Sequence, residues 1–351
     1  MKILITGGAG FIGSAVIRKA VAAGHQIINV DCLTYAASLE SLSSVIAPSL
    51  YHFEKVNIRD RGTISSILQK HQPDSIMHLA AESHVDRSID DPGGFIQTNI
   101  VGTYTLLEAA LNYFEGLKGE KKDHFRFHHV STDEVYGDLS KNDLAFTEET
   151  PYKPSSPYSA SKAAADHLVR AWRHTFDLPV LITNCSNNYG PFQFPEKLVP
   201  TVILKAIRGE PIPVYGSGEN IRDWLYVDDH AEALLLALQK GKIGETYNIG
   251  GNNERTNLEL VKTLCCIIDR QLDDGGNREN LIKFVPDRPG HDRRYAINAS
   301  KIKDDLGWEP SISFNEGFQK TVDWYISNEN KWTPLNGANG QGRLGLKTTH
   351  K

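Results

Sequence analysis

A glycine-rich loop directly after the first apolar segment constrains the fold of this chain more than any other feature. The segment at residues 2–6 is apolar, and Gly7-Gly8-Ala9-Gly10-Phe11-Ile12-Gly13 follows it and runs into a helical pattern. Glycines at this spacing permit a tight turn, let backbone amides approach a pyrophosphate and allow the helix to pack closely. The order strand, loop, helix therefore predicts a dinucleotide-binding βαβ unit rather than a purely structural turn.

Strand-like and helical segments alternate through the first half of the chain. We expect strands at residues 2–6, 26–31, 51–56, 75–79, 125–131 and 179–185, and helices at 11–23, 63–70, 99–114 and 157–176. Such alternation is typical of a parallel sheet that is covered on both faces. We therefore predict an α/β fold with a Rossmann-type doubly wound parallel sheet.

The pattern changes after about residue 190, where prolines at 191, 195, 200, 211 and 213 break the chain into shorter pieces. We expect an NAD-binding domain at 1–190, a smaller C-terminal substrate-binding α/β domain at 191–330 and a flexible tail at 331–351. Segments 222–227 and 245–249 are interpreted as strands that could return to the first part.

Composition excludes several classes of protein. The chain has 351 residues, of which 40% are hydrophobic and 23% are charged, which is typical of a soluble globular protein with two domains. A net charge of −5 gives no general attraction to nucleic acid or acidic membranes. The chain has no apolar run of membrane-spanning length, and its four cysteines lack metal or disulfide spacing. We expect a cytoplasmic protein with no metal, no nucleic-acid partner and no membrane partner.

An acidic residue ends the second predicted strand. Asp31 lies eighteen residues after Gly13, where a carboxylate can accept hydrogen bonds from a ribose 2′-hydroxyl. The same charge would repel a 2′-phosphate. The sequence therefore favours NAD over NADP as the cofactor.

A tyrosine and a lysine lie one turn apart at the start of a well-signalled helix. Ser156 can cap this helix and Pro157 suits its first position, so Tyr158 and Lys162 share one face. Tyrosine has a pKa of about 10, and a base near neutral pH needs that pKa lowered by roughly 2–3 units. We expect Lys162 and the oxidised nicotinamide to supply the positive charge. An exposed helix pair is the alternative.

A hydroxyl and two acids end the strand predicted before this helix, in the order Thr132-Asp133-Glu134. Thr132 could hydrogen-bond the same substrate hydroxyl as Tyr158. An acid and a base at this position suit elimination of water, provided that Asp133 is neutral and Glu134 is ionised. A solvated pair of carboxylates at the strand end is the alternative.

These motifs resemble the extended short-chain dehydrogenase/reductase superfamily, and within it the NAD-dependent epimerase/dehydratase family. The resemblance covers residues 1 to about 328 and rests on seven blocks: 79–88, 131–137, 158–162, 186–191, 194–198, 222–227 and 287–295. In related 4-epimerases the strand hydroxyl is typically not followed by a paired acid and base. The resemblance therefore implies a sugar-nucleotide 4,6-dehydratase that acts on dTDP-glucose in deoxysugar and lipopolysaccharide biosynthesis.

The resemblance also implies a role for each catalytic residue. Tyr158 takes the O4 proton while hydride leaves C4 for NAD, Glu134 removes the C5 proton, and Asp133 protonates the departing C6 oxygen. Hydride then returns to C6, which gives dTDP-4-keto-6-deoxyglucose. Another UDP- or GDP-sugar dehydratase, a 4-epimerase and a non-catalytic NAD-binding sensor stay open as alternatives. A sensor would not need Thr132, Tyr158 and Lys162 together.

By the same resemblance, further residues are expected to contact the ligands. Cofactor contacts are expected from Gly7, Gly10, Phe11, Ile12, Gly13, Asp31, Thr34, Asn57, Ile58, Ala80, Ala81, Ser83, Asn99, Tyr158 and Lys162. Substrate contacts are expected from Ser83, Asn187, Lys197, Leu198, Pro213, Val214, Tyr215, Arg222, Asn257, Arg288, His291 and Tyr295. Arginine suits phosphate because its planar guanidinium donates two parallel hydrogen bonds. Family members often carry aspartate in place of Asn57, and they pair the two helices that begin near Asn99 and Pro157 into a homodimer.

Overall fold

The computed structural model describes residues 1–45 and 49–328, so the predicted tail at 331–351 lies outside the described residues. The strands are β1 (Lys2–Thr6), β2 (Gln26–Asp31), β3 (Tyr51–Lys55), β4 (Ser75–His78), β5 (Arg126–Thr132), β6 (Val180–Cys185), β7 (Asn187–Tyr189), β8 (Ile212–Tyr215), β9 (Ile221–Tyr226), β10 (Thr246–Ile249), β11 (Glu254–Thr256) and β12 (Ile282–Val285). The α-helices are α1 (Phe11–Ala22), α2 (Arg61–His71), α3 (Val85–Asp90), α4 (Pro92–Phe95), α5 (Gly102–Gly116), α6 (Glu120–His124), α7 (Pro157–Phe176), α8 (Leu198–Arg208), α9 (Val227–Lys240), α10 (Asn257–Leu272), α11 (Ser300–Leu306) and α12 (Phe314–Ser327). Shorter helical segments are η1 (Leu39–Val45), the π-helical η2 (Ile96–Val101), η3 (Asp133–Tyr136) and η4 (Arg278–Leu281).

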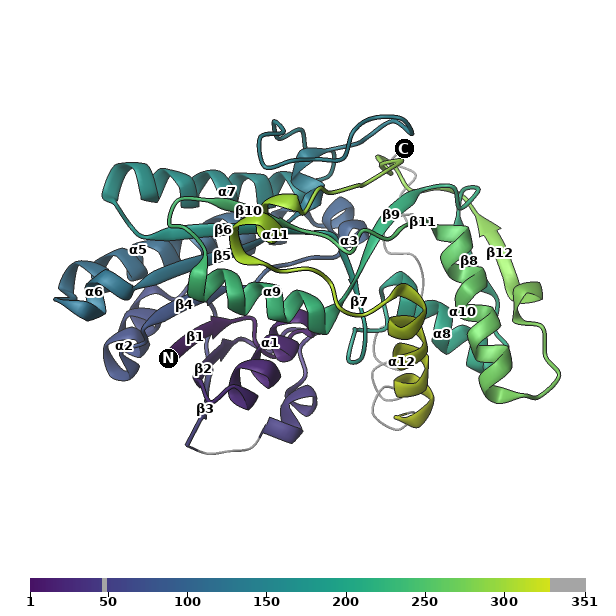
Figure 1. The fold of residues 1–351 in the computed structure, drawn as a ribbon, viewed down its shortest axis with the longest axis horizontal. Helices are drawn as coiled ribbons and strands as arrows, with labels where there is room; N and C mark the ends of the chain where they lie inside the picture. Colours follow the sequence, from purple (N-terminus) through teal and green to yellow (C-terminus); the bar gives the residue numbers. More distant parts are fainter. Residues whose placement is uncertain (46–48, 329–351) are drawn as a thin grey trace.

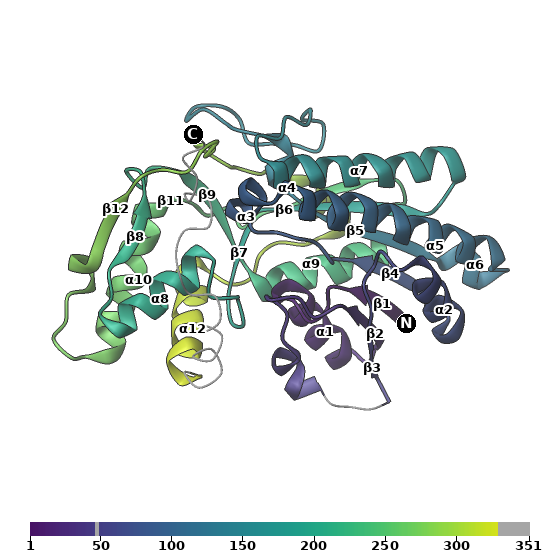
Figure 2. The same ribbon diagram turned by 180° about the vertical axis from the view of Figure 1, so that it is seen from behind.

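A seven-stranded parallel sheet forms the larger part of the molecule, with strand order β10-β6-β5-β4-β1-β2-β3. Helices cover both faces of this sheet (Figures 1 and 2). Successive residues of β1 point to opposite faces, so Ile3 and Ile5 join the core under α1 and α9, while Leu4 joins the core under α2, α5 and α7. The predicted Rossmann-type α/β fold is confirmed.

The predicted boundaries of several elements agree with the structure. β1 and β2 match residue for residue, and so does α7, whose Ser156 and Ser159 side chains form a reciprocal capping box. The helix expected to begin at Asn99 differs, because the π-helical η2 precedes α5. Helix segments of this kind are frequent at functional sites, and Asn99 lies within this one.

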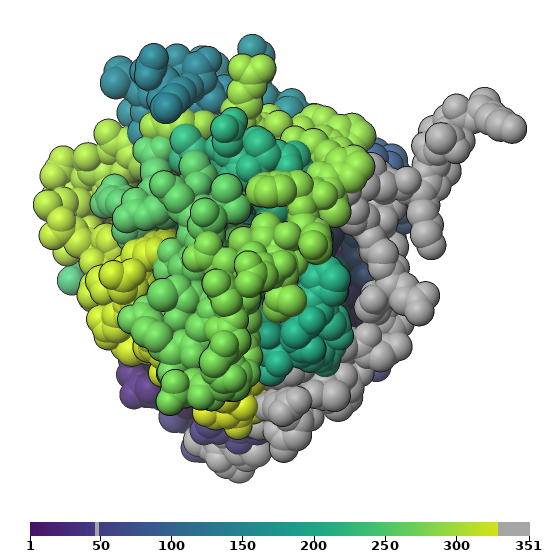
Figure 3. Space-filling view, turned by 90° about the vertical axis from the view of Figure 1, so that its right-hand side faces the viewer, coloured from purple at the N-terminus to yellow at the C-terminus, as the bar shows by residue number. Residues whose placement is uncertain are grey.

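The later part of the chain builds two smaller sheets and its own hydrophobic core. One sheet has the order β11-β9-β7 and the other pairs β12 with β8. Helices α8, α10 and α12 pack around a core that includes Val214, Leu264 and Phe318, and this part of the chain (green and yellow) forms most of the face in Figure 3. β10 returns to the large sheet beside β6, as expected, and β9 lies in the three-stranded sheet. The domain boundary near residue 190 stays a prediction.

Two prolines that were expected only to break the chain lie inside regular elements. Pro200 occupies the first turn of α8, where its missing N–H has no intrahelical acceptor to lose. Pro213 lies in β8, which pairs with one neighbour in a two-stranded sheet, so an edge without hydrogen bonds is available. In the described part of the chain, none of the helices has the length and apolar character needed to cross a membrane.

Candidate active site

The glycine loop passes close to the loop that follows β4. Gly7 has a φ of +73°, and a Cβ atom added to it would lie 2.7 Å from the Ala80 backbone nitrogen. A Cβ atom on Gly13 would lie 2.2 Å from the Gly7 carbonyl oxygen. No described side chain caps the N-terminus of α1, so the amides of Phe11 and Ile12 stay available for phosphate oxygens. These close approaches fit a dinucleotide at the switch point between β1 and β4.

Asp31 is buried at the end of β2, where its carboxylate organises the cofactor loops. Its Oδ2 accepts a hydrogen bond from the Ala9 amide at 3.0 Å, and its Oδ1 accepts one from the Leu33 amide at 2.8 Å. Burial raises the pKa of Asp31, and these two amides oppose the rise. Each carboxylate oxygen keeps a lone pair that a ribose hydroxyl can use.

The remaining residues expected near adenosine lie in the segments that follow β2 and β3. Thr34 is exposed beyond β2, while Ile58 is buried against Gly102. Asn57 Oδ1 accepts hydrogen bonds from the backbone amide and Nε of Arg59, at 3.0 and 3.2 Å. The Asn57 amide oxygen is therefore engaged within its own loop.

Asn99 holds the loop that follows β4. Its Oδ1 accepts from the Glu82 amide at 2.9 Å, and its Nδ2 donates to the Glu82 carbonyl at 3.0 Å and to Ser161 Oγ at 2.8 Å. Asn99 is buried, so these contacts use most of its hydrogen-bonding capacity. It therefore positions Ala81 and Ser83 rather than offering a free amide to a ligand.

The predicted catalytic residues come from three elements that contact one another. Thr132 ends β5, Asp133 and Glu134 begin η3, and Tyr158 and Lys162 lie in the first turns of α7. Thr132 Oγ1 accepts a hydrogen bond from the Glu134 amide at 3.3 Å and donates one to Asp133 Oδ1 at 3.4 Å. The structure thus brings together all five residues of this group.

The two adjacent carboxyl groups have different surroundings. Burial raises the pKa of Asp133 well above its ordinary value, and the charges of Glu134 and Asp223 raise it further. Asp133 is 1% exposed, and its Oδ2 has no hydrogen-bond partner among the described residues. Burial also raises the pKa of Glu134, but Arg288, Lys197 and Arg222 oppose that rise. The neutral form expected for Asp133 agrees with its environment, whereas Glu134 depends on nearby cations to stay ionised.

The Tyr158 phenol is buried in the described chain. Burial raises the pKa of Tyr158 well above its ordinary value, the charges of Glu134 and Cys185 add to that rise, and a hydrogen bond with Thr132 opposes it. Lys162 is buried and donates its Nζ proton to the Val130 carbonyl at 2.9 Å. Desolvation of the phenol thus dominates in the described chain, and the lowering of the Tyr158 pKa expected from Lys162 together with the oxidised nicotinamide stays a prediction.

Three cations from the later part of the chain surround Glu134. Lys197 Nζ donates to the Ser83 carbonyl at 2.8 Å, and burial lowers the pKa of Lys197. Arg288 Nη1 lies 3.3 Å from Asp86 Oδ1, and its buried Nε has no partner within the described chain. Arg222 is buried with its Nη2 donating to the Asp292 carbonyl at 2.9 Å. Arg288 thus has an unsatisfied donor for a phosphate oxygen, while Arg222 is largely committed to backbone carbonyls.

The other residues expected to contact substrate differ in whether their polar groups are free or already engaged within the protein. Asn187 and Asn257 each have a buried Oδ1 without a hydrogen-bond partner in the described residues, which suits a ligand contact. Strand alternation directs the Val214 side chain into the hydrophobic core and leaves Pro213 and Tyr215 on the other face, so a substrate contact of this segment stays a prediction. Contacts within the protein engage the rest: Leu198 packs against the core, Tyr215 donates to Asp86, His291 contacts Asp287, and Tyr295 donates to Asp292.

Sequence reasoning missed two acids that organise the substrate side. Asp86 accepts hydrogen bonds from Tyr215 OH at 2.8 Å and from Arg288 Nη1 at 3.3 Å. Asp292 accepts from Ser155 Oγ at 2.7 Å and from the Tyr295 hydroxyl. Both lie inside blocks of sequence that carry the family resemblance. Their presence in those blocks was the one sequence feature that could have indicated a role at the site.

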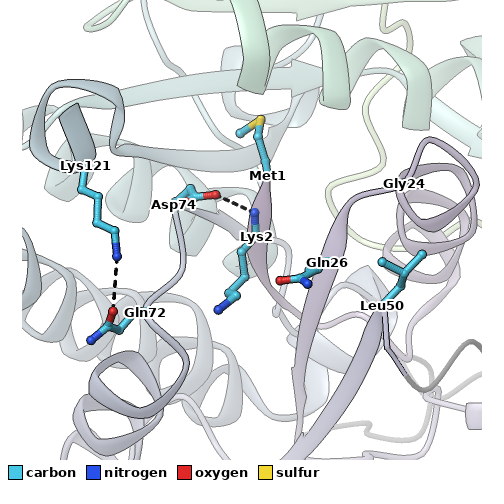
Figure 4. Close-up of a pocket in the computed structure, with 8 residues that line it drawn as sticks. All are labelled: Met1, Lys2, Gly24, Gln26, Leu50, Gln72, Asp74 and Lys121. Atoms are coloured by element: carbon cyan, nitrogen blue, oxygen red, sulfur yellow. Dashed lines mark hydrogen bonds between the residues drawn. The ribbon is translucent and has the colours of Figure 1, made fainter.

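A hollow of about 410 Å³ lies at the amino ends of the strands of the large sheet. The starts of β1 and β2 line it (Figure 4). The Lys2 amide donates to Asp74 there at 2.7 Å, and Lys121 donates to Gln72 at 3.3 Å. Ligands of open α/β sheets bind beyond the carboxyl ends of the strands. This hollow lies at the amino ends, so it is separate from the catalytic group.

Comparison with known proteins agrees with this geometry. The GDP-mannose 4,6 dehydratase family model matches residues 4–321. A dTDP-glucose 4,6-dehydratase from Escherichia coli is 58% identical, with 99% of each chain covered. The structure of dTDP-glucose 4,6-dehydratase from Bacillus anthracis in complex with NAD has a TM-score of 0.85 and 44% identity, and covers 95% of this chain and 99% of that one.

A second solved structure is equally similar. The dTDP-glucose 4,6-dehydratase from Streptomyces venezuelae, with NAD bound, has a TM-score of 0.86 and 42% identity, and covers 95% of this chain and 100% of that one. The matches extend over the cofactor loops, the paired acids and the later part of the chain. This chain therefore belongs to the nucleotide-sugar 4,6-dehydratase family, and within it to the dTDP-glucose 4,6-dehydratases.

Proposed function

We propose that this protein is an NAD-dependent hydro-lyase that converts dTDP-glucose to dTDP-4-keto-6-deoxyglucose and water. The observation that carries the proposal is the contrast between two neighbouring carboxyl groups beside Tyr158. Burial raises the pKa of both groups, well above the ordinary value for Asp133, whereas Arg288, Lys197 and Arg222 oppose the rise at Glu134. Elimination of water needs one acid and one base in this arrangement.

The cofactor loops fit NAD. The close approach of Gly7 to Ala80 and of Gly13 to Gly7 leaves backbone amides at the start of α1 for a pyrophosphate, and the carboxylate of Asp31 suits a ribose with a free 2′-hydroxyl. NAD held by these loops would supply reversible hydride transfer, by which a hydride taken from C4 of the sugar could be returned at C6. The protein's own groups handle every proton in the cycle.

Tyr158 is proposed to remove the proton from the O4 hydroxyl. Thr132 hydrogen-bonds the phenol, and Lys162 is held behind it by the Val130 carbonyl. Because burial disfavours the phenolate of Tyr158, the positive charge that lowers its pKa has to come mainly from the oxidised cofactor. Tyr158 would then act as a base only in the loaded enzyme.

Glu134 and Asp133 are proposed to carry out the elimination. Oxidation at C4 acidifies the C5 proton, which the Glu134 carboxylate removes. Asp133, protonated because of its burial, gives its proton to the departing C6 oxygen. Arg288, with an unsatisfied buried Nε, and Lys197 are proposed to bind the diphosphate.

The test is to incubate the purified protein with dTDP-glucose, UDP-glucose and GDP-mannose and to identify the products by mass. Loss of one water from the dTDP sugar alone is expected. Loss of water only from a UDP or GDP sugar would overturn the substrate assignment, and an isomer of unchanged mass would indicate an epimerase.

A homodimer that pairs through α5 and α7 is also proposed. These helices lie side by side on one outer face (Figure 2). Ile96, Tyr104 and Phe176 are 49%, 43% and 46% exposed there, and Trp172 contacts the rings of Tyr104 and Phe176 at centroid distances of 5.9 and 5.5 Å. Clustered apolar side chains of this size mark interaction surfaces.

Sedimentation equilibrium tests the dimer. The wild-type protein and Leu144→Glu, which changes an exposed apolar residue outside α5 and α7 in the loop between η3 and α7, should have the mass of two chains. Tyr104→Glu should have the mass of one chain, and a Tyr104→Glu dimer would exclude this interface.

A further inference from the structure

A fully buried carboxylate lies one helical turn beyond Lys162 and has no role in the steps above. Asp166 in α7 is 0% exposed. Its Oδ2 accepts hydrogen bonds from Ser131 Oγ and Tyr152 OH, both at 2.9 Å, and from Asn184 Nδ2 at 3.4 Å. A buried charge is costly unless it is paired and hydrogen-bonded. Donors from β5, from β6 and from the segment before α7 thus fix this carboxylate in one position.

Lys162 is the cation one turn before Asp166 in α7, and within the described residues it makes no salt bridge with a carboxylate. It is buried, it shares a helix face with Asp166 at a spacing of four residues, and its Nζ donates to the Val130 carbonyl at 2.9 Å. Burial lowers the pKa of Lys162, and Asp166 opposes that change. Burial would raise the pKa of Asp166, but His129, Lys162 and Ser131 lower it overall.

Apart from Arg170, the environment of each other ionisable group around this pair favours its neutral form. His129 Nε2 lies 3.1 Å from Asp166 Oδ1, yet burial lowers the pKa of His129 to about 4. Arg170 is the second cation, and its Nη2 donates to Tyr152 OH at 2.8 Å. Burial shifts the pKa of each remaining neighbour toward its neutral form: His78, Tyr136, Tyr152 and Cys185. Asp166 is therefore the main source of negative charge near Lys162, since Lys162 is hydrogen-bonded to Val130 and Asp166 to the next residue of β5, Ser131.

We propose that Asp166 is a positioning residue of the dehydratase reaction, whose buried carboxylate keeps Lys162 in its ammonium form behind Tyr158. This inference rests on the proposed function, since Lys162 matters only if Tyr158 exchanges a proton with the sugar. Without the carboxylate, the buried ammonium would lose its proton at a lower pH. Activity would then decline at alkaline pH while substrate binding stayed intact.

The test is the pH profile of the first hydride transfer, followed by reduced-nicotinamide absorbance after the NAD-loaded enzyme is mixed with dTDP-glucose. In Asp166→Asn the alkaline limb should move to lower pH by about 1–2 units, which is the effect of removing one charge at the separation of neighbouring turns. Tyr152→Phe is the matched control, because it removes a hydrogen bond to the same Oδ2 but keeps the charge. An unchanged alkaline limb in Asp166→Asn, or an equal shift in Tyr152→Phe, would overturn the proposal.

A measurement on the wild-type protein covers the case in which Asp166→Asn does not fold. The ¹³Cε resonance of Lys162, assigned by its loss in Lys162→Met, should have the shift of an ammonium at pH 8. A neutral amine at that pH refutes the role of Asp166. Wild-type enzyme that releases no water from dTDP-glucose would instead refute the proposed function and leave this titration to decide on Asp166 separately.

Discussion

Replacing Glu134 with glutamine tests the base assignment, because the amide keeps the shape of the side chain and removes its basicity. Glu134 follows Asp133 at the start of η3, and Arg288, Lys197 and Arg222 favour its ionised form. Loss of a positioned general base typically slows a reaction by roughly 10²–10⁴-fold, or about 3–5 kcal/mol in activation free energy. We expect product formation to decline by that factor.

Substrate binding should survive the same change. The three cations near Glu134 lose a competing negative charge, so the two phosphate charges of the substrate should bind as tightly as before or more tightly. Oxidation at C4 does not require Glu134. Reduced nicotinamide should therefore accumulate in a single turnover and persist, because elimination no longer consumes the ketosugar.

Three measurements decide the outcome: nicotinamide absorbance in a stopped-flow turnover, product mass, and exchange of the C5 proton with deuterated solvent. Glu148→Gln is the control, since Glu148 accepts a hydrogen bond from the Asn248 amide outside the catalytic group. Normal elimination, or C5 exchange at the wild-type rate in Glu134→Gln, would refute the reasoning.

Four further substitutions test the site. Tyr158→Phe should abolish the first hydride transfer, and reduced-nicotinamide absorbance at the normal rate in this variant would exclude the role. Asp31→Ala should weaken NAD roughly 10–100-fold in calorimetry and reduce discrimination against NADP, because charge-assisted hydrogen bonds are lost; affinities for both cofactors unchanged from the wild type would count against the ribose contact. Gly13→Ala places a Cβ 2.2 Å from the Gly7 carbonyl oxygen, so the binding free energy of NAD should weaken by about 1–3 kcal/mol. Gly62→Ala is the control and should bind NAD normally, because its Cβ would lie 3.7 Å from the nearest atom, Asp60 Oδ1. Burial raises the pKa of Asp133 in the folded protein. The stability that the neutral Asp133 carboxyl contributes is therefore complete below the pKa of the unfolded chain and is lost as pH rises through the folded pKa. Asp133→Asn should therefore raise the thermal midpoint at pH 8 and leave it unchanged near pH 3, and the same midpoint at pH 8 would contradict the burial argument.

The sequence predicted those parts of the fold that depend on local signals. β1 and β2 are apolar runs bounded by turn residues, and α7 begins at a serine cap followed by proline. The start of α5 differs from the prediction at residue 99. The π-helical turn that contains Asn99 is held by hydrogen bonds to Glu82 and Ser161, which are far away in sequence. No local pattern encodes such contacts.

The predicted catalytic residues meet in space, but their electrostatics could not be predicted from their order in the chain. A helical Tyr158-Lys162 pair suggested a depressed tyrosine pKa, yet Lys162 donates to the Val130 carbonyl and burial of the phenol raises the Tyr158 pKa. The surroundings of Arg222 and Val214 could not be predicted for a similar reason. Tertiary packing places backbone carbonyl acceptors beside Arg222 and surrounds the Val214 side chain with the hydrophobic core.

The later part of the chain determines which of Asp133 and Glu134 suits the role of acid and which suits the role of base. Asp133 and Glu134 are consecutive residues with similar chemistry, so their order at the end of β5 cannot by itself make one an acid and the other a base. Asp133 is buried near the carboxylate of Asp223, which favours its neutral form. Glu134 lies among Lys197, Arg222 and Arg288, whose charges favour its carboxylate. Because those cations come from the loop before α8, from β9 and from the segment after β12, the smaller part of the molecule sets the protonation states as well as offering groups for the nucleotide. Substitutions there that remove positive charge should therefore impair elimination in addition to binding.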